Sequence, residues 1–137
     1  MLFVQLKIKK KMLQDCKAFS SFSTDDIAKT RQFYEGVLGL KATEGMGGMV
    51  LDFEMNGSVP FIIYQKPDHR PADFTVFNFL VDDIEEAVAS LKNKGVVFES
   101  YDNGNIKTDE DNIFRGEGPL VAWFKDPSGN ILSLVQE

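Results

Sequence analysis

The chain has 137 residues, of which 43% are hydrophobic and 26% charged, and its formal net charge is −6. This length suits one globular domain that can bury a core of its own. The chain holds one cysteine and one histidine. It therefore cannot form an intrachain disulfide framework, and it cannot build a four-ligand zinc site from these two residue types alone.

The charge is unevenly distributed along the chain. Residues 1–12 contain four lysines and no acidic residue, which leaves 11 basic and 21 acidic residues, a net charge of −10, in the other 125. A body this acidic repels phosphate, so we expect no nucleic-acid partner. No apolar run approaches the roughly 20 residues that span a bilayer, so we expect no membrane partner. The lone Cys16 fits a reducing cytoplasm, which is the predicted location.

Residues 1–16 are predicted to be a flexible basic extension, and residues 17–137 a single domain. In chain order, a strand over 17–23 precedes a helix that begins at Asp25–Asp26 and ends at Gly39. Three β-type runs follow, separated by the turn signals Gly47–Gly48 and Asn56–Gly57, at residues 40–46, 48–55 and 59–65.

The second half of the domain repeats this plan. A polar linker over 67–73 separates a first module (17–66) from a second (74–137). In the second module a strand over 74–80 precedes a helix that begins at Asp82–Asp83 and ends at Gly95. A β-type run at 96–100, a long polar loop at 101–118 and two strands at 120–125 and 130–136 complete it. The order β-α-β-β-β therefore occurs twice, and it predicts an α+β fold.

Three segments resemble one known family, the vicinal oxygen chelate superfamily of glyoxalases, extradiol dioxygenases and bleomycin-resistance proteins. They are TDDIAKTRQFYEGVLGL (24–40), VDDIEEAVASLKNKGV (81–96) and WFKDPSGNILSLVQ (123–136). The resemblance covers about residues 17–136. It implies two tandem βαβββ modules that form an open, curved mixed sheet, a glyoxalase-like cup, with helices on the outside. The same fold hosts many chemistries, so it does not by itself imply an activity.

Metal-dependent members of this family hold a divalent ion on the first and last strands of each module. The matching positions here are Phe19, Val76, Ser133 and one residue within 62–64. Phenylalanine and valine cannot bind a metal, and a neutral serine is a poor ligand. The sequence therefore predicts a domain with no metal site and no cofactor.

Strand alternation predicts which side chains line the cup instead. If Phe19 faces the cup then Ser21 and Ser23 do too, whereas Phe22 packs under the helix. The predicted ligand-binding residues are Phe19, Ser21, Val76, Asn78, Val121, Trp123, Ser133 and Val135. Aromatic walls with a few hydroxyl and amide groups favour a flat organic ligand that is uncharged or cationic. Phe19 and Val76 could also fill the cup as core.

Three polar residues are candidates for a catalytic role. His69 in the linker could act as a general base, Tyr64 as a proton donor, and Arg115 on the long loop as an anion clamp. No nucleophile–base pair can be assembled from the sequence, and the catalytic residues stay unassigned.

Three functions remain open at this stage. The leading one is a protein that binds a small organic molecule in a metal-free cup and sequesters a drug or metabolite. The second is a metal-independent or atypical lyase, isomerase or dioxygenase of the same superfamily, and the third is a non-catalytic regulatory or scaffolding module. The resemblance also implies a homodimer, because bleomycin-resistance proteins bind ligands in crevices shared between subunits.

Overall fold

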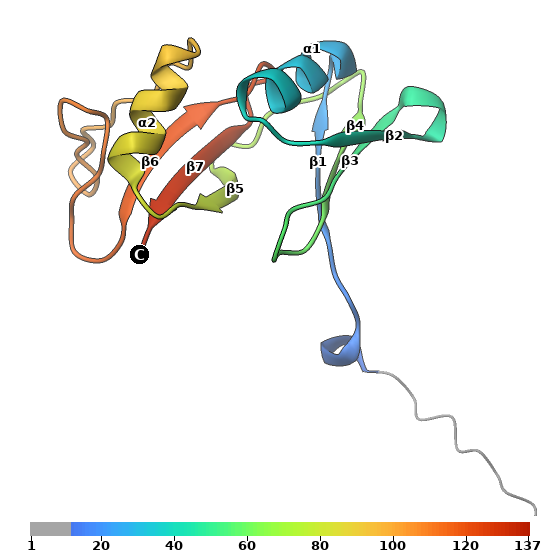
Figure 1. The fold of residues 1–137 in the computed structure, drawn as a ribbon, viewed down its shortest axis with the longest axis horizontal. Coiled ribbons are helices and arrows are strands. Elements are labelled where there is room, and N and C mark those ends of the chain that lie inside the picture. Colours follow the sequence, from blue (N-terminus) through green and yellow to red (C-terminus); the bar gives the residue numbers. More distant parts are fainter. Residues whose placement is uncertain (1–11) are drawn as a thin grey trace, which may run out of the picture.

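A computed structural model describes residues 12–137, so residues 1–11 of the predicted basic extension lie outside the described part. A short, exposed 3₁₀ turn, η1 (Leu13–Asp15), precedes the domain. In Figure 1 this segment stands away from the body of the molecule, and the chain enters the body at β1.

The first module folds into one mixed sheet, which we call sheet A, with the strand order β1–β4–β3–β2. Strand β1 runs parallel to β4, and the other pairs are antiparallel. After β1 the chain forms a short α-helix that continues as a π-helix, and a 3₁₀ turn separates β2 from β3. The bounds are β1 (Ser20–Thr24), α1 (Ile27–Arg31), η2 (Gln32–Val37), β2 (Ala42–Gly45), η3 (Met46–Gly48), β3 (Val50–Phe53) and β4 (Phe61–Gln65).

The second module forms a separate sheet, sheet B, with the order β5–β7–β6, in which β5 and β7 are parallel. Its elements are β5 (Thr75–Leu80), α2 (Ile84–Asn93), β6 (Leu120–Lys125) and β7 (Ile131–Gln136). The strand predicted over 96–100 is wrong, because only Phe98 bridges to β6, at Phe124. The N–H of Glu99 donates to the carbonyl oxygen of Trp123 on β6, whereas the carbonyl groups of Phe98 and Glu99 accept from the side-chain amide of Asn112.

The predicted helix caps are confirmed in both modules. The Asp26 carboxylate accepts from the backbone N–H of Lys29, and Asp83 does the same for Glu86. The glycines predicted to end the helices, Gly39 and Gly95, have φ of 75° and 93°, a region that disfavours any residue with a Cβ.

A glutamine at the end of a strand adds a second cap that the sequence analysis did not anticipate. Gln65 Oε1 accepts from the N–H of Ile27, and Gln136 Oε1 accepts from the N–H of Ile84. Each glutamine closes the last strand of its module onto the first turn of the helix. The internal repeat thus extends from the sequence to individual hydrogen bonds.

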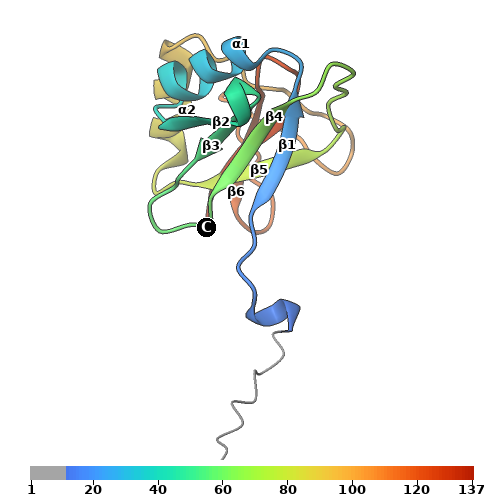
Figure 2. The ribbon, with the colours of Figure 1, turned by 90° about the vertical axis from the view of Figure 1, so that its right-hand side faces the viewer.

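The two sheets share one hydrophobic core. The ring of Phe77 on β5 lies 4.3 Å from that of Phe61 on β4 and 6.5 Å from that of Phe22 on β1. Phe33 of the π-helix meets Phe124 of β6 at 6.3 Å. Each sheet therefore turns one face towards this core, and its other face, which we call the outer face, points away from it. Figure 2 looks onto sheet A, with β1 and β4 in front and sheet B behind.

A buried hydrogen bond joins the modules at this core. The hydroxyl of Tyr34, which is fully buried, donates to Asp126 Oδ2 at 2.7 Å. Burial, together with the negative charge of Asp126 and this hydrogen bond, raises the pKa of Tyr34 well above its ordinary value. The predicted α+β fold is confirmed, with two mixed sheets and few helices.

Candidate functional site

The outer face of sheet B carries most of the residues that the sequence predicts to bind a ligand. On β7, Ser133 pairs with Asn78 on β5 and with Trp123 on β6, so the three side chains form one row across the sheet. The Ser133 hydroxyl and the Asn78 amide oxygen are 2.5 Å apart. Ser133 is fully buried, whereas Asn78 is exposed, so a ligand would meet the amide and not the hydroxyl.

A second apolar row lies at the end of the same face. Val135 on β7 pairs with Val121 on β6 and with Leu80 on β5. Leu80 is 71% exposed and leaves an apolar side chain in contact with solvent. Val76 lies at an irregularity in the β5–β7 register, between Thr75 and Phe77, and packs against the hydrophobic core. A bulge of this kind interrupts the strict alternation on which its predicted role depended.

A pocket of about 260 Å³ opens at the other end of this face, around Trp123. The indole N–H of Trp123 donates to the hydroxyl of Thr75 at 3.1 Å, which fixes the orientation of the ring. Tyr101 packs edge-on against the indole with ring centres 5.3 Å apart, and Phe114 lies 6.2 Å away. The lining residues are Asp73, Phe74, Thr75, Tyr101, Asn103, Ile106, Trp123 and Ile131.

The chemistry of this pocket is aromatic with one acidic group. Burial, and then the nearby charge of Glu99, raise the pKa of Tyr101, so its phenol stays neutral at physiological pH. Phe74 is 65% exposed and presents its ring to solvent. Three aromatic residues beside the carboxylate of Asp73 form a surface on which a flat ring can pack and near which positive charge is favoured.

The sequence analysis missed Phe74 and Tyr101. Phe74 stands just before β5, and Tyr101 comes from the long loop whose course no periodic pattern indicates. The one usable signal for Phe74 was its place next to the first strand of the module. For Tyr101 no signal of this kind exists, because long-range packing against Trp123 decides its position.

The residues predicted from the first module lie elsewhere. Phe19 is 63% exposed just before β1, and Ser21 is exposed on β1, on the outer face of sheet A. Neither lines the pocket at Trp123. Both residues belong to sheet A or its approach, whereas the pocket is lined by sheet B and the segments beside it. The alternation itself is confirmed, since Phe22 is buried between the exposed Ser21 and the half-buried Ser23.

The family's metal positions do not fit a metal ion here. Phe19 and Val76 have no ligand atoms, and the Ser133 hydroxyl is buried in its contact with Asn78. The fourth position falls within β4, at residues 62–64, where Tyr64 is the one polar side chain. Within residues 12–137, no three His, Cys, Asp or Glu side chains gather closely enough to hold an ion.

Of the three catalytic candidates, His69 in the linker and Tyr64 on β4 both neighbour Ser23 on β1. His69 Nδ1 is 2.6 Å from the hydroxyl of Ser23, and Ser23 pairs with Tyr64 across β1 and β4. The other ring nitrogen of His69 is 2.9 Å from the carbonyl oxygen of Ser128. The linker histidine therefore connects sheet A to the turn between β6 and β7.

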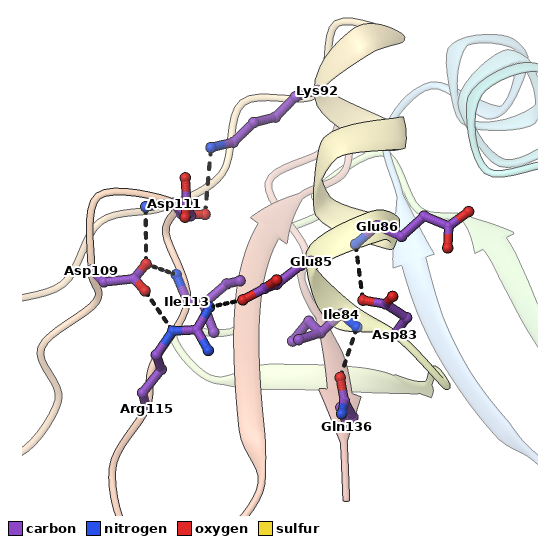
Figure 3. A network of polar contacts seen from close by, with 10 residues as sticks. All are labelled: Asp83, Ile84, Glu85, Glu86, Lys92, Asp109, Asp111, Ile113, Arg115 and Gln136. Atoms are coloured by element: carbon purple, nitrogen blue, oxygen red, sulfur yellow. Dashed lines mark hydrogen bonds and ion pairs between the residues drawn. The ribbon is translucent and has the colours of Figure 1, made fainter.

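Arg115 lies away from the pocket, against α2, as Figure 3 shows. Its guanidinium donates to Glu85 on α2 at 2.6 Å and to Asp109 in its own loop at 2.7 Å. Both contacts raise the pKa of Arg115, with the hydrogen bond to Asp109 as the largest cause. Through these two hydrogen bonds Arg115 holds its own loop against α2. Lys92 Nζ adds a further contact to the loop, at the carbonyl oxygen of Asp111.

The domain resembles several solved structures. A lactoylglutathione lyase from Agrobacterium tumefaciens is 17% identical, with 88% of this chain and 92% of that chain covered and a TM-score of 0.64. An antibiotic-binding protein from a Streptomyces species is 21% identical, with 88% and 96% covered and a TM-score of 0.64. A glyoxalase/bleomycin resistance protein from the same genus is 22% identical, with 88% and 100% covered and a TM-score of 0.62. At these identities the likeness establishes the fold alone.

No curated protein matches the chain. None of the helices in residues 12–137 is long and apolar enough to cross a membrane. A sequence model of one family matches residues 19–134, nearly the whole domain, and its span agrees with both modules and with the motifs that carry the resemblance. The chain therefore belongs to the Glyoxalase/Bleomycin resistance protein/Dioxygenase superfamily.

Proposed function

We propose that the protein binds a flat, aromatic, preferably cationic organic molecule in a metal-free cup. The observation that carries this proposal is the pocket in which Trp123 and Tyr101 meet edge-to-face, beside Phe74 and the carboxylate of Asp73. Stacked and edge-on aromatic pairs typically contribute about 0.5–1.5 kcal/mol beyond area burial. A cation over such rings adds a further attraction that a neutral ligand of the same shape lacks.

We further propose that a second copy of the chain completes the cup. The pocket of about 260 Å³ is smaller than the roughly 300–1,000 Å³ that encloses drug-sized ligands. The outer faces leave large apolar side chains uncovered, with Phe19, Phe74 and Leu80 between 63% and 71% exposed. The outer face of sheet A from one copy, placed over sheet B of the other, would cover these side chains and deepen the pocket.

Ligand binding is tested by calorimetry with two probes of similar size, 9-aminoacridine as the cation and acridine as its neutral counterpart. Tyr101→Ala and Phe74→Ala should each weaken binding of the cation about tenfold, a loss of about 1.4 kcal/mol. Asp73→Asn should reduce the preference for the cation. Val97→Ala, at an 82% exposed position outside the pocket, is the matched control. Equal affinity of all variants, or no binding of either probe, would refute the proposal.

The metal-free character has its own test. Addition of Ni²⁺, Zn²⁺, Mn²⁺ or Fe²⁺ should leave the melting temperature unchanged, because only a ligand that binds the native state stabilises it. A stoichiometric metal that survives purification and raises the melting temperature would overturn this part of the proposal.

Dimerisation is tested by light scattering coupled to size-exclusion chromatography. Leu80→Asp should convert a dimer to a monomer, because it places a charge on an apolar outer face. Val97→Asp, an equally exposed apolar position elsewhere, should leave the dimer intact. A monomeric wild-type protein at micromolar concentration would contradict the shared cup and leave the pocket of each chain to bind alone.

A further inference from the structure

A serine–histidine pair lies on the edge of sheet A, outside the aromatic pocket. The hydroxyl of Ser23 is 2.6 Å from Nδ1 of His69, and Nε2 of His69 is 2.9 Å from the carbonyl oxygen of Ser128. A carbonyl oxygen can only accept a hydrogen bond. In the neutral ring Nε2 therefore carries the proton, Nδ1 offers its lone pair, and the Ser23 hydroxyl donates to it.

This arrangement meets the geometric requirement for an activated nucleophile. A hydroxyl becomes reactive when an adjacent base can take its proton and when a third group holds that base in the correct tautomer. His69 is the base, and the backbone carbonyl of Ser128 is the third group. The separation of Ser23 and His69 by 46 positions explains why the pair cannot be read from local sequence.

The surroundings hold both partners in place. Ser128 belongs to the turn between β6 and β7, where its N–H donates to Asp126 Oδ1 and its hydroxyl donates to Asp25 Oδ1. The backbone carbonyl of Ser23 accepts from the side-chain amide of Asn130, in the same turn. The turn of the second module therefore fixes both the base and the strand that carries the nucleophile, so little reorganisation precedes proton transfer.

Both residues of the pair keep part of their surface in contact with solvent. Ser23 and His69 are both half-buried, and Ser23 faces the outer side of sheet A, since its neighbours Phe22 and Thr24 are buried. Tyr64 and Ser21 lie on the same face, on the paired strand and two residues before Ser23.

We propose that Ser23 accepts an acyl group from a small ester or thioester, with His69 as the general base. As Ser23 Oγ attacks the acyl carbon, its proton passes to His69 Nδ1. The ester bond then breaks, and the leaving alcohol or thiol takes that proton, which leaves an acyl-Ser23. Water attacks this acyl group, gives one proton to His69 and releases the carboxylic acid, and the proton returns to Ser23. Ester and water are the two reactants, and no redox step occurs.

This inference goes beyond the proposed ligand binding and does not depend on it. The aromatic pocket belongs to sheet B, whereas Ser23 and the ring of His69 belong to the side of sheet A. A protein could bind a ligand at Trp123 and be inert towards esters, or the reverse.

The test mixes the full chain with an excess of p-nitrophenyl acetate and follows p-nitrophenolate before the steady state, with peptide mass spectrometry to locate the acetyl group. We expect a burst of p-nitrophenolate that approaches one per chain and an acetyl group on Ser23. Ser23→Ala should abolish both, and His69→Gln should slow acylation at least a hundredfold, the usual contribution of general-base catalysis. Ser20→Ala, at an exposed serine at the start of β1 to which no role is assigned, should behave as wild type.

A purely structural hydrogen bond would give a different outcome. It would give no burst of p-nitrophenolate, no acyl group on Ser23 and no dependence of Ser23 reactivity on His69. If Ser23→Ala fails to fold, Ser23→Cys in a Cys16→Ser background replaces it. Its alkylation by iodoacetamide should then be fast and should fall on His69→Gln. Acetylation at lysines alone, or alkylation indifferent to His69, would overturn the proposal.

Discussion

Replacement of Tyr34 by phenylalanine tests the hydrogen bond that joins the two modules. Tyr34 is fully buried, and its hydroxyl donates to Asp126 Oδ2, which also accepts from the side-chain amide of Asn130 at 2.9 Å. The substitution removes one oxygen and keeps the aromatic ring, so it leaves no cavity the size of a side chain. It isolates the polar contact from the packing around it.

The expected loss of stability follows from the type of bond removed. A hydrogen bond to a charged acceptor typically contributes about 1.5–3 kcal/mol to stability. Asp126 keeps its hydrogen bonds to Asn130 and to two backbone N–H groups, those of Ser128 and Asn130. Because these partners limit the penalty on the remaining carboxylate, we expect a loss of about 2 kcal/mol.

The measurement is equilibrium unfolding in urea, followed by the fluorescence of Trp123. With a slope of about 2 kcal/mol per molar urea, the midpoint of Tyr34→Phe should fall by about 1 M with the slope unchanged. Tyr64→Phe is the control, because Tyr64 is half-buried and its hydroxyl has no hydrogen-bond partner within residues 12–137. A shift below about 0.25 M for Tyr34→Phe would refute the reasoning.

The stability of the same variant should also depend less on pH in the alkaline range than that of the wild type. The pKa of Tyr34 is raised well above its ordinary 10.0 by burial and by Asp126. A raised folded pKa gives stability that is fully present below the unfolded pKa and is lost as the pH rises towards the folded one. Wild-type stability should therefore fall above about pH 10, and Tyr34→Phe should lose less over that range.

Two further predictions concern α2 and the loop that it carries. Arg115→Gln should cost less than about 1 kcal/mol, since its ion pairs are exposed, but should speed amide exchange around Asp109. Burial is the largest single influence on the pKa of Asp109 and raises it, but the hydrogen bond and charge of Arg115, together with the backbone N–H groups of Ile113 and Asp111, outweigh burial and lower the pKa. Because a lowered pKa gives stability that is lost as the pH falls through the folded pKa, the loop should also loosen below about pH 3.8. Asp83→Ala should lower the stability to thermal unfolding by about 1 kcal/mol, because the backbone N–H of Glu86 loses its cap. Asp82→Ala, the control, should change it by less than about 0.5 kcal/mol. Equal effects of the two substitutions would refute the capping role.

The elements that obey a local rule were predictable. Asp26 and Asp83 cap their helices as their spacing indicates, because an N-cap needs only the three residues that follow it. Phe22 is buried and Ser21 exposed, because alternation on a strand is a property of the backbone itself.

The elements that depend on a distant partner were not predictable. Residues 96–100 have the composition of a strand, but they form a single bridge to β6, and the carbonyl groups of Phe98 and Glu99 accept from the side-chain amide of Asn112. The register irregularity at Val76 likewise arises from the pairing of β5 with β7, and the sequence of β5 alone does not predict it. A β-type run becomes a strand only where a neighbour offers an edge in register.

The position of Arg115 could not be predicted from the sequence either. Its place in a long loop favours a ligand clamp, yet Glu85 on α2 takes up its guanidinium from 30 positions away. Loop residues are positioned by such contacts, which no periodic pattern records.

The sequence by itself determined the two-module plan, the family, and the side chains at the three metal positions that it can place, Phe19, Val76 and Ser133. These features depend only on the spacing and the type of residues along the chain. Only the tertiary structure decided that Tyr101 packs against Trp123 and that His69 forms a hydrogen bond with Ser23. The physical reason is that a shared hydrophobic core orients both sheets at once, and every contact across it follows from that packing.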